Sequence, residues 1–122
     1  MMNLEMSCSD GCAVISASGS LSAEDDIDIV VAALVFVPPD DHLVLDLLGV
    51  DRLSASGAVV LAQALLERAA CAAEVVVVID RPDVAVRLIV NDVDRVVPMV
   101  ATMQQAVQVV MARSGFDAME VA

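Results

Sequence analysis

The sequence predicts a single α/β domain with a mostly parallel central sheet. Apolar runs typical of buried strands alternate with amphipathic patterns typical of helices, in the order β-β-α-β-α-β-α-(β)-α. Single helices between successive strands imply right-handed crossovers, which make those strands parallel. The 122 residues suit one domain with one core. We therefore expect residues 1–122 to form one domain, without internal repeats or a linker.

The first third of the chain predicts two strands and a helix. Residues 12–19, CAVISASG, alternate loosely and end at a glycine, which predicts a strand that follows a hairpin partner. Ser22 and Asp25 have the spacing of a capping box at a helix start. The residues that follow at helical spacing form an apolar stripe: Ile27, Val30, Val31 and Leu34. The prolines of PPDD end this helix.

The middle of the chain predicts a strand, a helix and a second strand. Residues 42–48, HLVLDLL, form a buried strand, and its one polar residue, Asp46, is interpreted as hydrogen-bonded at the strand end rather than catalytic. A helix begins near residues 54–56, and its buried stripe is Ala58, Leu61, Ala62, Leu65 and Ala69. Residues 74–79, EVVVVI, lack alternation and predict a strand covered on both faces.

The last third predicts two helices around a short edge strand. Pro82 suits the first turn of a helix, and Pro98 restricts DRVVPMV to an edge strand because proline cannot donate to a central ladder. Thr102 and Gln105 form another capping box before a last helix. The stripe of that helix comprises Met103, Ala106, Val107 and Val110. Residues 114–122 are expected to form a loose tail.

The charge of the chain limits its partners. It has 18 acidic residues against six basic ones, all arginine, and a formal net charge of −12. This field opposes binding to nucleic acid or to an anionic membrane, so we expect neither and favour a basic protein partner. No apolar run reaches the roughly 18 residues of a membrane span. The N-terminus also lacks the basic start of a signal peptide, so the expected location is the cytoplasm.

The three cysteines leave two interpretations open. Cys8 and Cys12 flank SDG, where a hairpin could bring the two thiols together, and Cys71 lies far away in the sequence. Free reduced thiols are one interpretation and a redox pair formed by Cys8 and Cys12 is the other. A metal site would need more ligands than this chain offers, because His42 is its one histidine. We expect no metal and no cofactor.

The junction sequence SASG lacks the motifs of common enzymes. The nucleophile pattern G-x-S-x-G is absent, and His42 precedes Ser54 and Ser56, the reverse of the order in an α/β-hydrolase. A phosphate-binding loop would need more glycines and a lysine, and the chain contains no lysine. We therefore expect no enzymatic activity; turnover or saturable ligand binding by the purified protein would overturn this.

The segment HLVLDLLGVDRLSASGAVVLAQAL resembles the signature of the STAS domain, the fold of bacterial anti-sigma factor antagonists. The positions in register are Leu45–Leu47, Gly49, Val50, Leu53, Ser56, Gly57 and Leu61. VISASGSLSAE is similar to the first conserved segment of the family, and AVRLIVNDVDRVVPMVATMQQAV is similar to its usual ending. The resemblance covers about residues 10–112, and it implies a STAS-type fold.

The resemblance implies a protein-interaction switch. An antagonist of this family binds an anti-sigma factor that is also a serine kinase, and phosphorylation of the serine before the glycine, here Ser56, expels it; Ser54 is the second choice. A serine phosphatase restores binding, and the usual form is a monomer, with a weak homodimer as the other possibility. The expected partner-binding residues are Gly19, Ser20, Leu21, Ser22, Leu53, Ser54, Ala55, Ser56, Gly57, Val60 and Gln63.

This chain departs from the family pattern at acidic positions. Ser54 stands for the usual Asp before the phosphorylated serine, Ala55 for its first Ser, and Ser20 and Ser22 for an upstream Glu and Asp. Ser54 and Ser22 keep the ability to cap a helix but remove negative charge. The alternative function is therefore a STAS interaction module without phosphorylation, either constitutive or redox-tuned through Cys8 and Cys12.

Overall fold

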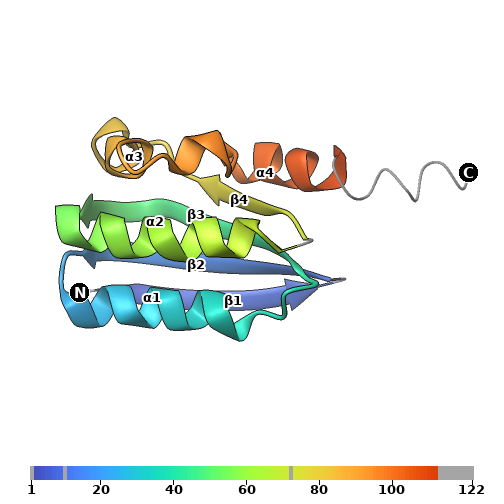
Figure 1. Cartoon of the computed structure of the whole chain (residues 1–122), viewed down its shortest axis with the longest axis horizontal. Coiled ribbons are helices and arrows are strands. Elements are labelled where there is room, and N and C mark those ends of the chain that lie inside the picture. The colour runs from blue at the N-terminus through green and yellow to red at the C-terminus, as the bar shows by residue number, and fades with distance from the viewer. Residues whose placement is uncertain (1, 10, 72, 113–122) are drawn as a thin grey trace, which may run out of the picture.

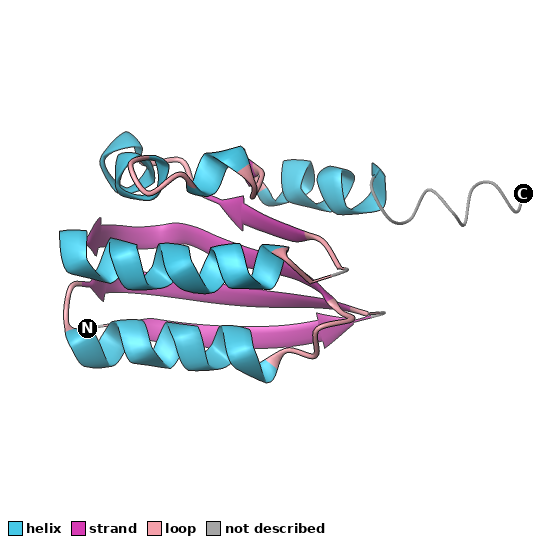
Figure 2. Ribbon diagram, in the orientation of Figure 1, coloured by secondary structure: helices cyan, strands magenta, loops and turns pink. Residues whose placement is uncertain are grey.

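The computed structural model describes residues 2–9, 11–71 and 73–112, which form one five-stranded sheet with helices on both faces (Figure 1). The elements are β1 (Asn3–Ser9), β2 (Cys12–Leu21), α1 (Glu24–Phe36), β3 (His42–Leu53), α2 (Ala55–Ala69), β4 (Val75–Val78), α3 (Pro82–Ile89), the 3₁₀ helix η1 (Val93–Arg95), β5 (Met99–Val100) and α4 (Met103–Val110). The strands lie in chain order, with β1 antiparallel to β2 and the other pairs parallel (Figure 2). The predicted α/β domain is confirmed, and the predicted tail at 114–122 lies outside the described residues.

The sheet supports one large core and one small one. The large core lies between the sheet and the helices α1, α2 and α3, and its strand residues include Ala13, Ile15, Leu43, Leu45, Val75 and Val77. On the other face, the alternate valines of β3 and β4 pack against Ala106 and Val110 of α4. All four residues of β4 are buried, as its lack of alternation predicts.

Strands β2 and β3 run further than the sequence predicts, to Leu21 and Leu53. Their pairing has two irregularities, one between Ser16 and Ser18 and one between Gly19 and Ser20. A Cβ on Gly49 would lie 2.7 Å from the Cβ of Ser18, and Gly19 has a φ of 91°. The glycines therefore permit bulges, which bend a strand without ending it.

The local signals in the last third of the chain are confirmed with one correction. Pro82 opens α3, β5 is a short edge strand after Pro98, and Thr102 and Gln105 form a complete capping box. Val107 is exposed rather than part of the buried stripe, because Ala106 and Val110 are the α4 residues that face the sheet. Among the described helices, none is long and apolar enough to cross a membrane.

Arg68 of α2 is the one charged residue buried in the described part of the chain, with 8% of its surface exposed. Its guanidinium donates to four backbone carbonyl oxygens at 2.6–3.4 Å, those of Leu34, Val37, Pro38 and Asp41. These carbonyls belong to the last turn of α1 and the loop before β3, where a helix end leaves its acceptors without partners. Arg68 thus fastens the C-terminal end of α1 to α2.

We expect Arg68→Ala to lower the free energy of unfolding by about 3 kcal/mol, because buried carbonyls lose a charged donor. Arg68→Lys should restore only part of the loss, since one ammonium cannot reproduce the fork of the guanidinium. Urea unfolding followed by circular dichroism measures both, with Arg87→Ala as the exposed control. A loss no larger than that of the control would contradict this role.

Candidate functional site

The predicted site lies where β2 and β3 end and α1 and α2 begin. In open α/β sheets the carboxyl ends of the strands are the usual place for binding sites. The two junctions touch each other directly, because the backbone N–H of Ser54 donates to the carbonyl oxygen of Leu21 at 3.2 Å. Residues far apart in the sequence are thereby brought to one edge of the sheet.

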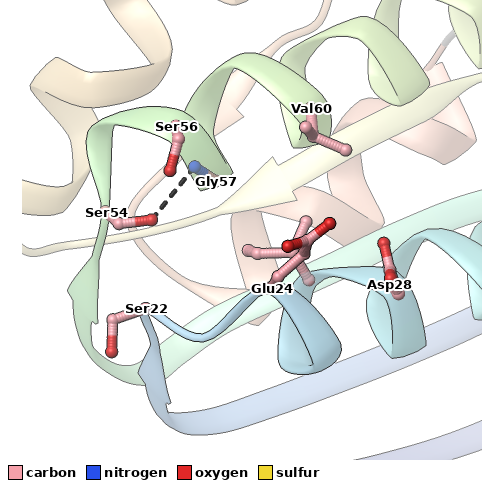
Figure 3. A pocket seen from close by; sticks show the side chains of 8 residues that line it. Ser22, Glu24, Asp28, Ser54, Ser56, Gly57 and Val60 are labelled. Atoms are coloured by element: carbon pink, nitrogen blue, oxygen red, sulfur yellow. Dashed lines mark hydrogen bonds between the residues drawn. The ribbon is translucent and has the colours of Figure 1, made fainter.

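A hollow of about 440 Å³ opens between these junctions (Figure 3). Its lining comprises Ser22, Glu24, Ile27, Asp28, Ser54, Ser56, Gly57 and Val60. The junction before α1 and α1 itself provide a hydroxyl, two carboxylates and an apolar side chain, while the start of α2 provides two hydroxyls and a valine. The structure therefore brings together five of the predicted partner-binding residues.

Two acidic residues of the hollow, Glu24 and Asp28, were not predicted as site residues. Glu24 lies in the acidic first turn of α1, where a carboxylate favours the start of a helix. The two carboxylates are one helical turn apart, and this spacing places them on the same face of α1. That spacing is visible in the sequence, but the packing of this face beside α2 is not.

Ser54 caps α2, as its sequence predicts. Its Oγ accepts a hydrogen bond from the backbone N–H of Gly57 at 3.0 Å (Figure 3). This bond satisfies one of the N–H groups that a helix start leaves free. Because the Ser54 oxygen is engaged in the cap and its side chain is half-buried, the geometry favours Ser56 over Ser54 as a group available to a partner.

Gly57 lets α1 and α2 approach closely at the hollow. A Cβ at this position would lie 2.8 Å from both the Cδ1 of Ile27 and the Oγ of Ser54. Real Cβ atoms do not reach such distances, so a side chain here would force Ile27 to move or disturb the Ser54 cap. Gly57 is therefore a close-packing residue at the contact between α1 and α2.

Ser56 and Val60 are exposed on the outer face of α2. Ser56 is in the first turn, and Val60, one turn later, keeps 44% of its surface exposed. Gln63 is exposed further along the same helix. We call Ser56, Val60 and Gln63 the crest of α2, and this part of the predicted surface is open to a partner.

A second hollow, of about 490 Å³, lies between α2 and α3. Its lining comprises Ala55, Ala58, Val59, Asp83, Val86, Arg87, Val90 and Asn91. Ala55, a predicted partner-binding residue, thus faces this hollow rather than the one beside Ser56. The crest of α2 therefore lies between two depressions.

Three predictions about the junction residues are corrected. Leu21 and Leu53 are buried in the large core, so their side chains cannot contact a partner and instead anchor the strand ends. Ser22 does not cap α1, because β2 continues to Leu21 and the helix begins only at Glu24; the N-cap is Ala23. The Oγ of Ser22 instead lies 2.7 Å from the Oγ of Ser20, at the end of β2 and just after the half-buried Gly19.

Asp46 has the structural role that its sequence context predicts. Its carboxylate accepts hydrogen bonds from the Oγ of Ser16 at 3.1 Å and from the backbone N–H of Leu48 at 2.9 Å. The first bond joins β2 to β3 and the second lies within β3, so Asp46 acts inside the sheet rather than at a strand end. Among the described residues, no group of three or more His, Cys, Asp or Glu side chains is arranged to hold a metal ion.

The predicted hairpin around Cys8 and Cys12 is present, but its register separates the two thiols. Cys8 pairs with Ala13, and Cys12 pairs with Ser9. Paired residues share a face of the sheet and successive residues alternate, so Cys8 and Cys12 lie on opposite faces. Both cysteines are free, and this arrangement disfavours a disulfide between them.

No protein-family model and no curated protein sequence matches this chain. Among solved structures, it is similar to an anti-sigma factor antagonist from Mycobacterium paratuberculosis, with a TM-score of 0.73 and 24% identity over 90% of this chain and 94% of that one. It is also similar to the anti-sigma factor antagonist SpoIIAA in its unphosphorylated form, with a TM-score of 0.71 and 14% identity over 90% and 97%. An uncharacterized protein from Shewanella loihica with a SpoIIAA-like fold gives 0.56 and 14% over 89% and 93%. The chain therefore has the SpoIIAA-like fold, as the STAS resemblance implies.

We expect Gly57→Ala to destabilise the protein by about 1–3 kcal/mol, although alanine is the better helix former, because the new Cβ meets Ile27 and the Ser54 cap. Adding Ile27→Val removes the Cδ1 atom and should recover part of the loss. Denaturant unfolding of the two single variants and the double variant measures this coupling. Purely additive effects would contradict a direct clash.

Burial raises the pKa of the Cys12 thiol, and the neighbouring Asp41 carboxylate and Cys8 add to this effect. Because the thiolate is the reactive form, Cys12 should be alkylated slowly at neutral pH and faster only as the pH rises beyond the ordinary range of a thiol. Iodoacetamide kinetics on the Cys8→Ser/Cys71→Ser variant test this. Asp41→Asn should shift the rate profile to lower pH, and an unshifted profile would exclude the carboxylate as a cause.

Proposed function

We propose that this protein is an anti-sigma factor antagonist that binds an anti-sigma factor of the serine-kinase type and is released when Ser56 is phosphorylated. Two solved proteins with this fold are anti-sigma factor antagonists, which supports the general role. The observation that carries the finer proposal is the place of Ser56, exposed in the first turn of α2 and lining an open hollow. The partner contacts this hollow and the crest of α2.

The position of Ser56 suits a phosphate group. The start of a helix carries a partial positive charge and free N–H groups, so a phosphate there costs the fold little. The Ser54 cap uses the N–H of Gly57, and the first turn has further N–H groups with no partner inside the helix. An exposed hydroxyl beside an open hollow is also accessible to a kinase.

The chemistry of the hollow explains how a phosphate releases the partner. Phosphorylation adds a charge of about −1.5 to −2 at neutral pH. The residues that line the hollow include the carboxylates of Glu24 and Asp28 and no arginine. A partner that covers phosphorylated Ser56 would remove water from the phosphate. No arginine lines the hollow to compensate the phosphate charge, so this desolvation is costly.

Glu24 and Asp28 are relevant to a difference between this chain and the family pattern, which has acidic residues where this chain has serines. Serines replace acidic residues at positions 20, 22 and 54, but α1 contributes two carboxylates to the same hollow from other positions. We propose that these carboxylates attract basic side chains of the partner, in keeping with the net charge of −12. Negative charge at the site is thus supplied by a neighbouring helix.

The remaining parts of the proposal follow the family mechanism. A serine phosphatase returns the protein to its binding form, the chain itself catalyses no reaction, and the switch operates in the cytoplasm. The alternative is a constitutive interaction module without phosphorylation. Redox tuning through Cys8 and Cys12 is disfavoured, because the hairpin register places the two residues on opposite faces.

The test starts with protein purified from its native cells while phosphatases are inhibited, followed by mass spectrometry of intact chain and peptides. We expect phosphate on Ser56. The anti-sigma factor captured by Ser56→Ala is then purified, and its affinity is measured by calorimetry. Ser56→Asp should bind at least about tenfold more weakly, a difference of about 1.4 kcal/mol, whereas Val96→Asp, which adds the same charge at another exposed site, should bind normally.

Other results have defined meanings. Phosphate on Ser54 would show that the modified position is shifted by two residues and would overturn the assignment of Ser56. An unmodified chain in both growing and stressed cells, together with equal binding by Ser56→Ala and Ser56→Asp, would establish the constitutive module instead. Capture of no anti-sigma factor by any variant would overturn the proposal as a whole.

A further inference from the structure

The outer side of β1 (Asn3–Ser9) is an unprotected edge of the sheet. In the described sheet β1 pairs only with β2, through seven consecutive register positions without a bulge. It contains no proline and no lysine, and its one charged residue is Glu5. The opposite edge, β5, has only two residues and follows Pro98. Proteins usually shorten or interrupt their edge strands to prevent pairing, and this chain does so only at β5.

The two faces of β1 differ in polarity. Leu4, Met6 and Cys8 pair with Ala17, Ile15 and Ala13 and lie on the face of the large core, while Asn3, Glu5 and Ser7 lie on the other. Leu4 packs against the core, but Met6 keeps 37% of its surface exposed and Cys8 is exposed. The strand at this edge therefore has a partly exposed row of apolar side chains on one face and a row of polar side chains on the other.

We propose that β1 pairs antiparallel with β1 of a second copy of this chain, around a two-fold axis at Met6. Met6 is the central residue of the strand, so this pairing uses its whole length. Met6 lies opposite Met6 of the second copy, Leu4 opposite Cys8, and Glu5 opposite Ser7. The two sheets become continuous, and the apolar row of one chain covers that of the other.

Polarity and charge select this register over its neighbours. A shift by one residue would place apolar side chains opposite polar ones on both faces. Centring the pairing on Glu5 would place two carboxylates opposite each other, which destabilises an antiparallel pair. Centring it on Ser7 would leave the start of each strand, including Leu4, unpaired. The strand is thus complementary to itself in the register centred on Met6.

The association should be weak and should strengthen with salt. Each chain carries a net charge of −12, so two copies repel each other at low ionic strength. Added salt screens this repulsion, while the backbone hydrogen bonds of the new strand pair are little affected. This behaviour is the opposite of that of an interface held by ion pairs. The proposal does not depend on the function proposed for Ser56.

Sedimentation equilibrium of the full chain, over a range of protein and NaCl concentrations, tests the proposal. We expect a monomer–dimer equilibrium that moves toward dimer as NaCl rises. Met6→Asp should weaken the dimer at least about tenfold, since it places two carboxylates opposite each other. Val35→Asp is the matched control, because it adds the same charge at a more exposed valine on α1, and it should leave the dimer unchanged. Thermal unfolding of Met6→Asp verifies that the monomer still folds.

Crosslinking tests the register. In a Cys8→Ser/Cys12→Ser/Cys71→Ser background, Met6→Cys should form a disulfide-linked dimer with oxidised glutathione as the oxidant. Ser7→Cys, whose neighbour across the axis is Glu5, should do so far more slowly. A monomer at every protein and salt concentration would overturn the proposal. So would equal effects of Met6→Asp and Val35→Asp, or equal crosslinking rates of the two cysteine variants.

Discussion

The close approach of α1 and α2 at Gly57 is the constraint on which the candidate site depends. Without a Cβ at this position, Ile27 of α1 packs against the first turn of α2, and the Ser54 cap remains intact. The hydroxyls at the start of α2 and the carboxylates of α1 then line one hollow. Arg68 holds the same two helices together at their other end. The shape of the site is therefore fixed at both ends of a single helix–helix contact.

Local patterns in the sequence predicted the order of the elements, and they predicted the caps at Ser54 and Thr102 correctly, because these depend on residues within one helical turn. The ends of β2 and β3 were predicted too early, because a glycine such as Gly19 signals a bulge as readily as a strand end. Because β2 was predicted to end too early, the start of α1 was also predicted too early, and Ser22 was interpreted as its cap.

The residues that the sequence did not predict owe their roles to contacts between elements. Glu24 and Asp28 join the site only because α1 lies beside α2, and Arg68 is buried only because the end of α1 supplies it with acceptors. The sequence could nevertheless place Ser56, Gly57 and Val60, since one helix start carries all three. The sequence could predict residues that act together within one segment, but it could not predict contacts that form between two segments.

The bonds of Arg68 have a consequence for how the protein opens. One side chain holds carbonyls that lie 27 to 34 positions earlier in the chain, so the loop before β3 cannot detach while the last turn of α2 stays in place. The two segments should therefore exchange their amide hydrogens as one cooperative unit rather than as separately fraying ends. The candidate site lies at the opposite ends of α1 and α2 from Arg68. Local opening is thereby suppressed at the ends of α1 and α2 that lie away from the candidate site.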